Sequence, residues 1–227
     1  MVAVAKTPFA SASAAEVLAW LKAHPALRPH LKSQLHRLPT GLTPLDTLLG
    51  GGLPCGGITE IVGRGSSGRT SLSLAVLGYS TQRGEAVAWV DPQDALDPVS
   101  AKAAGIDLGR LLWIRPEGAE ALKLGLNAAE LVLEAGGFAG LVLDVAGSRW
   151  RAVLGKLAAW VRLTHRLERS RTVLIVLAPQ TVVGSMAALR LECRRLGKSG
   201  AMLVRILKQR HGAPGAETRL ALGDAVD

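Results

Sequence analysis

Residues 63–71 of the chain, GRGSSGRTS, have the spacing of a loop that binds phosphate. Gly63 and Gly68 stand at the interval that lets backbone N–H groups turn toward an anion, and the start of a following helix would add its positive dipole end. Thr70 occupies the place of a hydroxyl that ligates Mg²⁺. The lysine that reaches the β and γ phosphates in such loops is replaced by Arg69, whose planar fork is broader than an ammonium group. We therefore expect a cradle that can bind an anion but does not support efficient hydrolysis.

This loop lies between a strand pattern and a helix pattern, which is the context that such a motif requires. Short apolar runs alternate with helical patterns along most of the chain, and this alternation is typical of a parallel sheet covered by helices on both faces. The expected strands are 58–63, 86–91, 111–116, 140–147 and 172–179, and the expected helices are 68–84, 98–105, 118–137 and 149–170. Three further apolar segments, at 188–197, 201–212 and 217–224, are expected to form antiparallel strands at the C-terminal end.

The N-terminal part of the chain has a different pattern. Residues 12–23 carry apolar side chains on one helical face, and a proline-bearing stretch follows them. Residues 40–57 predict a short helix that is closed by a run of glycines. We expect an N-terminal helix and linker over residues 1–37 and a core domain over residues 38–227.

The bulk properties are those of one globular domain. With 227 residues, 48% of them hydrophobic, and a mean hydropathy of +0.26, the chain can bury a core of its own. No apolar run approaches the roughly 18 residues that cross a bilayer, and the start of the chain lacks the apolar core of a signal peptide. Cys55 and Cys193 show neither a pairing pattern nor metal-ligand spacing, so we interpret both as free thiols of a reducing, cytoplasmic compartment. No metal site is expected.

Positive charge is concentrated in the second half of the chain. Residues 145–212 contain fourteen Lys and Arg residues against two acids, in a chain of net charge +9. This imbalance indicates a polyanion or an acidic protein as partner, and the alternative is a solvated basic surface. Trp150 and Trp160 could stack on bases, but their helical pattern with leucines favours packing. The candidate DNA or partner contacts are Arg149, Arg151, Arg190, Arg194, Arg195, Lys198, Arg205, Lys208 and Arg210.

Four stretches of the sequence resemble the core of the bacterial RecA recombinase family. They are TGLTPLDTLLGGGLP at 40–54, GGITEIVGRGSSGRTSLSLAVL at 56–77, AVAWVDPQDALDPVSAKAAGIDLGRLLWIRP at 86–116 and GLVLDVAG at 140–147. The combination of DALDP and GIDLGRLL after the second strand is not general among proteins with phosphate-binding loops. The resemblance implies an α/β fold with a RecA-like P-loop core: a mostly parallel sheet with helices on both faces, antiparallel strands at the C-terminal end, and a short N-terminal helix.

Residue by residue, the resemblance implies a nucleotide site that has lost parts. The loop lysine of the family falls on Arg69, its catalytic glutamate on Gln93 and its adenine-stacking tyrosine on Ser100. A carboxamide can orient a water molecule but cannot accept its proton, so we do not expect enzymatic hydrolysis. Asp97 and Asp144 remain, the latter at the Mg²⁺-side position, where a strand-end acid is also tolerated without a metal. The vestigial nucleotide-binding residues are Gly63, Ser66, Ser67, Gly68, Arg69, Thr70, Gln93, Asp97 and Asp144. No cofactor is expected, beyond weak binding of ATP with Mg²⁺ at most.

The two loops that grip DNA in the recombinases are short here, at 145–148 and 180–188. A short RecA-like chain with a degenerate nucleotide site and a basic half most resembles the ImuA-type proteins, which are accessories of SOS-induced translesion synthesis. This resemblance implies a non-hydrolysing role in the bacterial cytoplasm, near the nucleoid. Its implied partners are an ImuB-type Y-family-like polymerase subunit, RecA and an error-prone DNA polymerase complex, with DNA as a further candidate and no membrane. Two alternatives stay open: a divergent DNA-dependent ATPase or recombinase, and a basic DNA-binding subunit.

Overall fold

The computed structural model describes residues 36–146, 157–197, 201–210 and 212–221. The helix expected at 12–23 and the candidate contacts Arg149, Arg151 and Lys198 lie outside these residues. Within the described ranges, no helix has the length and apolar character needed to cross a membrane.

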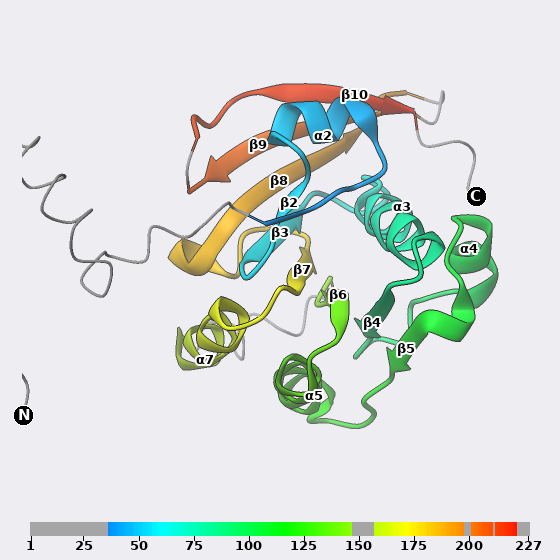
Figure 1. Cartoon of the computed structure of the whole chain (residues 1–227), viewed down its shortest axis with the longest axis vertical. Helices are drawn as coiled ribbons and strands as arrows, with labels where there is room; N and C mark the ends of the chain where they lie inside the picture. Colours follow the sequence, from blue (N-terminus) through cyan, green and yellow to red (C-terminus); the bar gives the residue numbers. More distant parts are fainter. Residues whose placement is uncertain (1–35, 147–156, 198–200, 211, 222–227) are drawn as a thin grey trace, which may run out of the picture. The chain divides into compact units, whose positions relative to one another are not determined.

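The described core is built on a sheet of eight strands in the order β10-β9-β8-β3-β7-β6-β4-β5 (Figure 1). Neighbouring strands run parallel from β8 to β5, and β9 and β10 are antiparallel to their neighbours. The central strands are mainly apolar because both of their faces are covered. The strands are β3 (Ile58–Val62), β4 (Ala86–Val90), β5 (Leu111–Ile114), β6 (Phe138–Asp144), β7 (Val173–Ala178), β8 (Ala187–Arg195), β9 (Ala201–Gln209) and β10 (Glu217–Ala221). A separate antiparallel pair joins β1 (Arg37–Leu38) to β2 (Leu53–Pro54).

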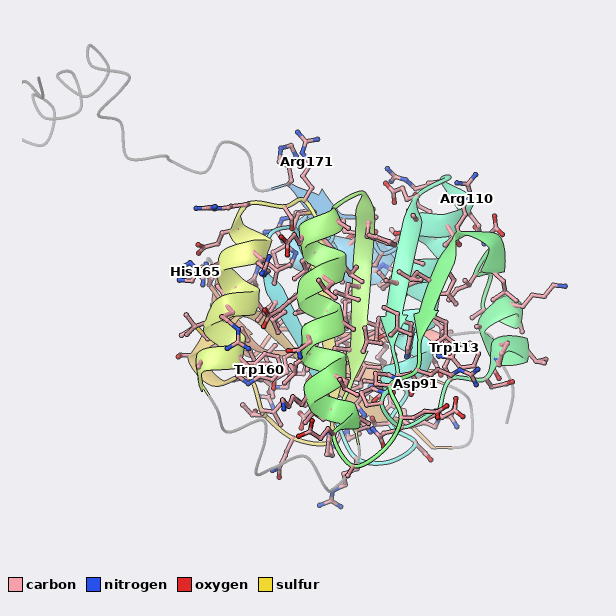
Figure 2. All side chains as sticks on the ribbon, turned by 90° about the horizontal axis from the view of Figure 1, so that it is seen from below. Asp91, Arg110, Trp113, Trp160, His165 and Arg171 are labelled. Carbon is pink, nitrogen blue, oxygen red and sulfur yellow. The ribbon has the colours of Figure 1, made fainter. Side chains whose placement is uncertain are left out.

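Helices cover both faces of the sheet. Residues that alternate along each strand divide between two hydrophobic clusters, one on each face. The helices are α2 (Thr43–Leu49), α3 (Arg69–Gln82), α4 (Pro98–Ala103), α5 (Ala121–Ala135) and α7 (Leu157–Glu168). Helices α2, α3 and α4 contribute to one cluster, and α5 and α7 lie side by side on the other face (Figure 2). Trp160 of α7 is 2% exposed in the second cluster, so its predicted packing role is confirmed.

Helix α2 is the short helix expected before the glycine run. Pro44 stands in its first turn, where the missing N–H has no partner to lose. Gly50 ends the helix with a φ of 71°, a left-handed conformation that glycine adopts without strain. The Asp46 carboxylate accepts hydrogen bonds from the N–H and the hydroxyl of Thr40, at 2.9 and 2.8 Å. These bonds fix the segment that leads into the core.

The expected arrangement did not say how the C-terminal run joins the core. Strand β8 opens this run and pairs parallel to β3, with Ala187 beside Ile58 at the start of that strand. Strand β7 ends beside Val62, at the other end of β3. Residues 179–186 therefore run back along β3 from its carboxyl end to its amino end, and we call them the crossing segment. The predicted α/β core with its mostly parallel sheet and C-terminal antiparallel strands is confirmed.

Candidate nucleotide site

The phosphate-binding loop lies at the carboxyl end of the parallel strands, between β3 and α3. Gly68 precedes α3 with a φ of 91°, and no side chain caps the helix, so its first N–H groups remain available to an anion. Ser66 has a positive φ of 57°. Gly63 is required by close packing, because a Cβ there would lie 2.6 Å from the carbonyl oxygen of Cys193. The backbone keeps the helix N-terminus and the glycine positions that the predicted anion cradle needs.

Arg69 is the first residue of α3 and is half-buried. Its Nη1 atom is buried and has no hydrogen-bond partner among the described residues, and the buried hydroxyl of Ser67 also lacks one. Burial lowers the pKa of the Arg69 guanidinium, while the charges of Asp144 and Cys193 act in the opposite direction. A guanidinium remains protonated at neutral pH despite such a shift. The cradle therefore holds its own cation, whereas Thr70 at the next position is exposed.

Asp144 ends β6 and is 5% exposed. Its Oδ1 accepts a hydrogen bond from the N–H of Ala146 at 3.0 Å. Burial raises the pKa of the Asp144 carboxyl, the Ala146 bond lowers it, the charge of Asp91 raises it further, and Arg69 lowers it; the balance is a raised pKa. No group of three or more His, Cys, Asp and Glu side chains in the described part of the chain could hold a metal ion. A Mg²⁺ ion at this end would depend on Asp144, Thr70 and the phosphate oxygens of a nucleotide.

Gln93 follows β4 in a segment that is held by Asp91. The fully buried Asp91 carboxylate accepts the N–H groups of Ala95 and Leu96, at 3.0 and 2.9 Å, and Nε1 of Trp113 lies 3.4 Å from it. The Nε2 atom of Gln93 is buried and has no hydrogen-bond partner among the described residues. The side chain thus brings an amide to the place where the resemblance puts a catalytic carboxylate.

Asp97 is tied to the helix that follows it. It is the N-cap of α4, where its carboxylate accepts the N–H groups of Val99 and Ser100, at 3.2 and 2.8 Å, and the hydroxyl of Ser100 at 2.6 Å. The hydroxyl bond of Ser100 and then the two backbone bonds lower the pKa of Asp97, against a small opposing effect of burial. In the structure, Asp97 and Ser100 therefore act together in the N-terminal cap of α4.

Glu60 is a buried residue that the sequence reasoning missed. It lies in the middle of β3, and its carboxylate is fully buried. Oε1 accepts the N–H groups of Val182 and Val183 in the crossing segment, and Oε2 accepts Nε of Arg190. Buried backbone N–H groups need acceptors, and the crossing segment obtains two of them from this one side chain. We call Glu60, Arg190 and residues 182–184 the Glu60 clamp; the signal for it was an acid inside the apolar run ITEIV.

The clamp changes the interpretation of the basic residues. Arg190 also donates to the carbonyl of Gly184 at 2.8 Å, and Nζ of Lys208 donates to the carbonyl of Ser185 at 2.8 Å. Burial, then the charges of Arg190 and Arg210, lower the pKa of Lys208, and Glu60 opposes them. These two predicted contacts therefore hold the crossing segment. Four others are exposed and form no ion pair with another described residue: Arg194, Arg195, Arg205 and Arg210.

Comparison with known proteins identifies the family of the chain. Residues 26–153, more than half of the chain, match the family model described as RecA N-terminal domain. The chain belongs to the RecA family. Protein RecA of Aquifex aeolicus is 32% identical over 225 residues, which cover 81% of this chain and 64% of that protein. Protein RecA of Fusobacterium nucleatum is 42% identical over 109 residues, which cover 47% of this chain and 28% of that protein.

The sequence matches are partial in length, and the fold resembles that of a solved structure. This RecA-family chain spans less than two thirds of the length of the curated relatives above. The crystal structure of the RadB recombinase superposes with a TM-score of 0.66 at 22% identity, covering 80% of this chain and 94% of that one. At this identity the likeness shows the fold alone, and it confirms the predicted RecA-like core.

Proposed function

We propose that this chain is a non-hydrolysing RecA-like accessory protein of DNA damage-induced translesion synthesis. It acts in the cytoplasm by binding an ImuB-type Y-family-like polymerase subunit, RecA, or both, within an error-prone polymerase complex. The observation that carries the proposal is the chemistry of the nucleotide site. Arg69 puts a half-buried guanidinium in the cradle, and Gln93 puts an amide where turnover needs a base.

The two replacements act against turnover for separate reasons. The unpartnered Nη1 of Arg69 could donate a hydrogen bond to a phosphate oxygen, so weak binding of ATP is compatible with the site. Gln93 cannot take a proton from an attacking water, whatever is bound. A site of this kind supports occupancy without efficient hydrolysis, and it favours a function in binding over one in turnover.

The edge of the sheet offers a surface for such binding. Strand β5 is the last strand on its side, and an edge strand presents unpaired N–H and C=O groups to another chain. Leu108 and Leu112 beside and within this strand are exposed at 42% and 43%. We place the proposed partner contact at this edge.

A second candidate function is DNA binding through the basic strands. It is favoured by the four exposed arginines of β8, β9 and the residue after β9, which form no ion pair with another described residue. Binding of this type would fall steeply with salt, in proportion to the number of phosphates contacted.

Phosphate release by the purified full chain tests the absence of hydrolysis. With ATP, Mg²⁺ and single-stranded DNA, we expect no release above background, whereas a RecA recombinase assayed beside it turns over. The double variant Arg69→Lys with Gln93→Glu supplies the two missing groups, one in the loop and one after β4, so we expect it to release phosphate above the wild-type background.

Turnover by the wild type at the rate of the recombinase would overturn the proposal and favour the ATPase alternative. Binding partners are measured on the same preparation with immobilised RecA and polymerase subunit. Leu112→Glu at the sheet edge should weaken capture, and Leu131→Glu, which changes a leucine that is 66% exposed on α5, should not. Retained DNA binding without any protein capture would favour the second candidate.

A further inference from the structure

The edge strand β5 is tied at its carboxyl end to the segment that carries Gln93. Nε1 of Trp113 in β5 donates to Oδ2 of Asp91 at 3.4 Å. Arg115, which follows β5, pairs with Asp94 at 3.3 Å, and its guanidinium lies over the Trp113 ring, 4.6 Å from the ring centroid. We call Asp91, Asp94, Trp113 and Arg115 the edge bridge. It joins the edge strand to the chain on both sides of Gln93.

The edge bridge continues a row of residues across the carboxyl ends of the strands. Val90 of β4 lies beside Leu143 of β6, so Asp91 and Asp144, which directly follow them, are neighbours. The row runs on through the end of β7 to the end of β3, where the phosphate loop begins. The pKa of Asp144 fits this arrangement, since burial and then the charge of Asp91 raise it, whereas Arg69 lowers it. The row therefore leads from the phosphate loop to the edge of the sheet.

The two ends of this row share an uncommon backbone conformation. Ser66 in the loop and Asp94 in the edge bridge have φ angles of 57° and 53° and are the non-glycine residues of the described chain with a positive φ. Such a conformation persists where the surroundings fix it, and it concentrates at binding and switch segments. Between these points, Nη1 of Arg69 and Nε2 of Gln93 are buried donors without a partner among the described residues. Phosphate oxygens are acceptors that would satisfy both donors.

Strand β5 depends strongly on the contacts at its end. It has four residues and one neighbouring strand, so it makes few backbone hydrogen bonds of its own. One of these bonds runs from the N–H of Asp91 to the carbonyl of Ile114 at 2.8 Å, beside the edge bridge. Leu112, the exposed residue of the proposed partner contact, directly precedes Trp113. Whatever orders the edge bridge therefore acts next to the surface that a partner would use.

We propose that ATP bound at the phosphate loop strengthens partner binding at the β5 edge, and that the edge bridge carries this coupling. The phosphate oxygens accept from Arg69 and Gln93 and order residues 91–96, and the edge bridge then orders the end of β5. A partner that pairs with an ordered strand loses less conformational entropy on binding. The coupling is reciprocal, so the partner also strengthens ATP binding. This inference rests on the proposed partner contact at β5.

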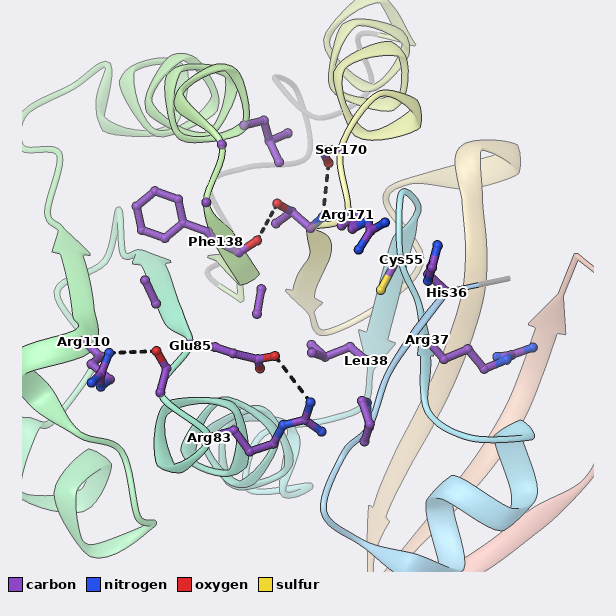
Figure 3. Close-up of a pocket in the computed structure, with 18 of the residues that line it drawn as sticks. His36, Arg37, Leu38, Cys55, Arg83, Glu85, Arg110, Phe138, Ser170 and Arg171 are labelled. Carbon is purple, nitrogen blue, oxygen red and sulfur yellow. Dashed lines mark hydrogen bonds and ion pairs between the residues drawn. The ribbon is translucent and has the colours of Figure 1, made fainter. Parts of the chain in front are cut away.

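The amino end of β5 supplies a matched control. Figure 2 shows Arg110, which precedes β5, at the opposite end of the sheet from Asp91. A cavity of 850 Å³ lies at that end, and Figure 3 shows Arg110 in its wall. Arg110 pairs with Asp107 at 3.3 Å and donates to the carbonyl of Gly84 at 2.7 Å. Its side chain is 47% exposed, close to the 52% of Arg115, so the two arginines differ chiefly in the end of the strand that they hold.

Hydrogen–deuterium exchange of the full chain, with and without millimolar ATP, tests the coupling in the absence of any partner. Calorimetric titration of the same preparation measures ATP binding. We expect ATP to slow exchange severalfold in peptides that cover residues 91–96 and 111–115. Peptides that cover β10, the strand at the opposite edge of the sheet, should exchange at an unchanged rate.

Variants of the edge bridge locate the connection. The double variant Trp113→Phe with Arg115→Ala removes the indole N–H and the guanidinium but keeps an aromatic ring for packing. In it, ATP should still slow exchange at 91–96 but no longer at 111–115. Arg110→Ala should keep both responses. Exchange of β10 at the wild-type rate shows that a variant is folded, and the single variant Arg115→Ala, at an exposed position, replaces the double variant if that one does not fold.

Capture by immobilised RecA extends the test to a partner. ATP should raise capture of the wild type and of Arg110→Ala severalfold, and it should leave capture of the double variant unchanged. Slowed exchange at 111–115 without any capture would support the edge bridge and contradict the accessory function, so the two proposals fail separately.

Four outcomes would overturn the coupling. They are absence of calorimetric binding at millimolar ATP, binding without slower exchange at 111–115, a response at 111–115 that persists in the double variant, and capture of the wild type that does not depend on ATP. Each would mean that the contacts of Trp113 and Arg115 only support the fold of the edge strand.

Discussion

The two ends of the parallel sheet use their charged groups in opposite ways. At the carboxyl end, Asp91 and Asp97 accept backbone N–H groups, and Arg69 carries a half-buried guanidinium at the start of α3. At the amino end, Arg171 lines a cavity and forms no ion pair with a described residue, and Arg37 donates to the carbonyl of Gly52 at 3.0 Å. A recognisable motif nevertheless lies only at the carboxyl end.

The comparison shows that the backbone shape of a binding loop and the side chains that contact a ligand can change independently. Gly63 and Gly68 keep the shape because the fold requires them: a Cβ on Gly63 would lie 2.6 Å from the carbonyl oxygen of Cys193, and Gly68 has a left-handed φ of 91°. The receiving groups are replaced at Arg69 and Gln93. A loop can therefore be retained by the packing of the fold after the groups for turnover are gone.

Replacing Glu60 gives the largest expected effect, because the Glu60 clamp holds the crossing segment through buried hydrogen bonds. Glu60→Ala leaves two backbone N–H groups without their acceptor and Arg190 without its partner. Breaking a buried pair from one side costs about 3 to 5 kcal/mol. We expect a loss of unfolding free energy in this range, measured by urea denaturation.

The matched control is Glu120→Ala, which removes an exposed acid paired with Lys123 at 3.2 Å. Exposed pairs contribute about 0 to 1 kcal/mol, so the control should unfold close to the wild type. Equal stability of the two variants would show that the crossing segment is held by apolar contacts rather than by the hydrogen bonds of the Glu60 clamp.

Most of the fold was predictable because it depends on local patterns. Short, mainly apolar runs such as ITEIV and LVL, separated by longer helical patterns, indicate buried strands of a parallel sheet, and the structure buries both of their faces. The direction of β8 was not predictable from its own pattern. Strand direction is set by the length and course of the crossing segment, whose anchor, Glu60, is far from it in sequence.

The sequence predicted where the candidate site lies, but it did not predict which contacts its side chains make. The spacing of the loop located the carboxyl end, yet Asp97 caps its own helix and Arg190 and Lys208 hold the crossing segment. The cavity at the amino end had no sequence signal. Its arginines, such as Arg37 and Arg171, come from separated segments that only the sheet topology brings together.

A pair of glycine variants tests whether packing alone retains the loop, with an intermediate expected effect. In Gly63→Ala the new Cβ would lie 2.6 Å from the carbonyl oxygen of Cys193 and 2.5 Å from Oγ of Ser67. Overpacking of this kind costs about 1 to 3 kcal/mol. Gly65→Ala in the same loop meets no atom within 4 Å, so its melting temperature should match the wild type. Equal melting temperatures for both variants would mean that packing does not require glycine at position 63.

The smallest expected effect comes from Asp144, and its sign is informative. The pKa of Asp144 is raised in the folded chain, so ionisation is less favourable there than in the unfolded chain. Asp144→Asn cannot ionise, and its amide oxygen can still accept the Ala146 N–H. The variant should therefore be slightly more stable than the wild type at neutral pH. Urea midpoints should converge as the pH falls from the raised pKa toward the ordinary value of about 3.9.

Asp97→Asn provides the opposite case on the same side of the sheet. The folded pKa of Asp97 is lowered by the Ser100 hydroxyl and the backbone N–H groups, so its ionised form stabilises the fold above the ordinary aspartate pKa. The variant should be less stable than the wild type at neutral pH, and the difference should vanish as the pH falls through the lowered pKa. If Asp144→Asn also lost stability at neutral pH, attraction between Asp144 and Arg69 would outweigh burial. The carboxyl end would then be held together by a charge pair, rather than carrying a buried acid at a cost.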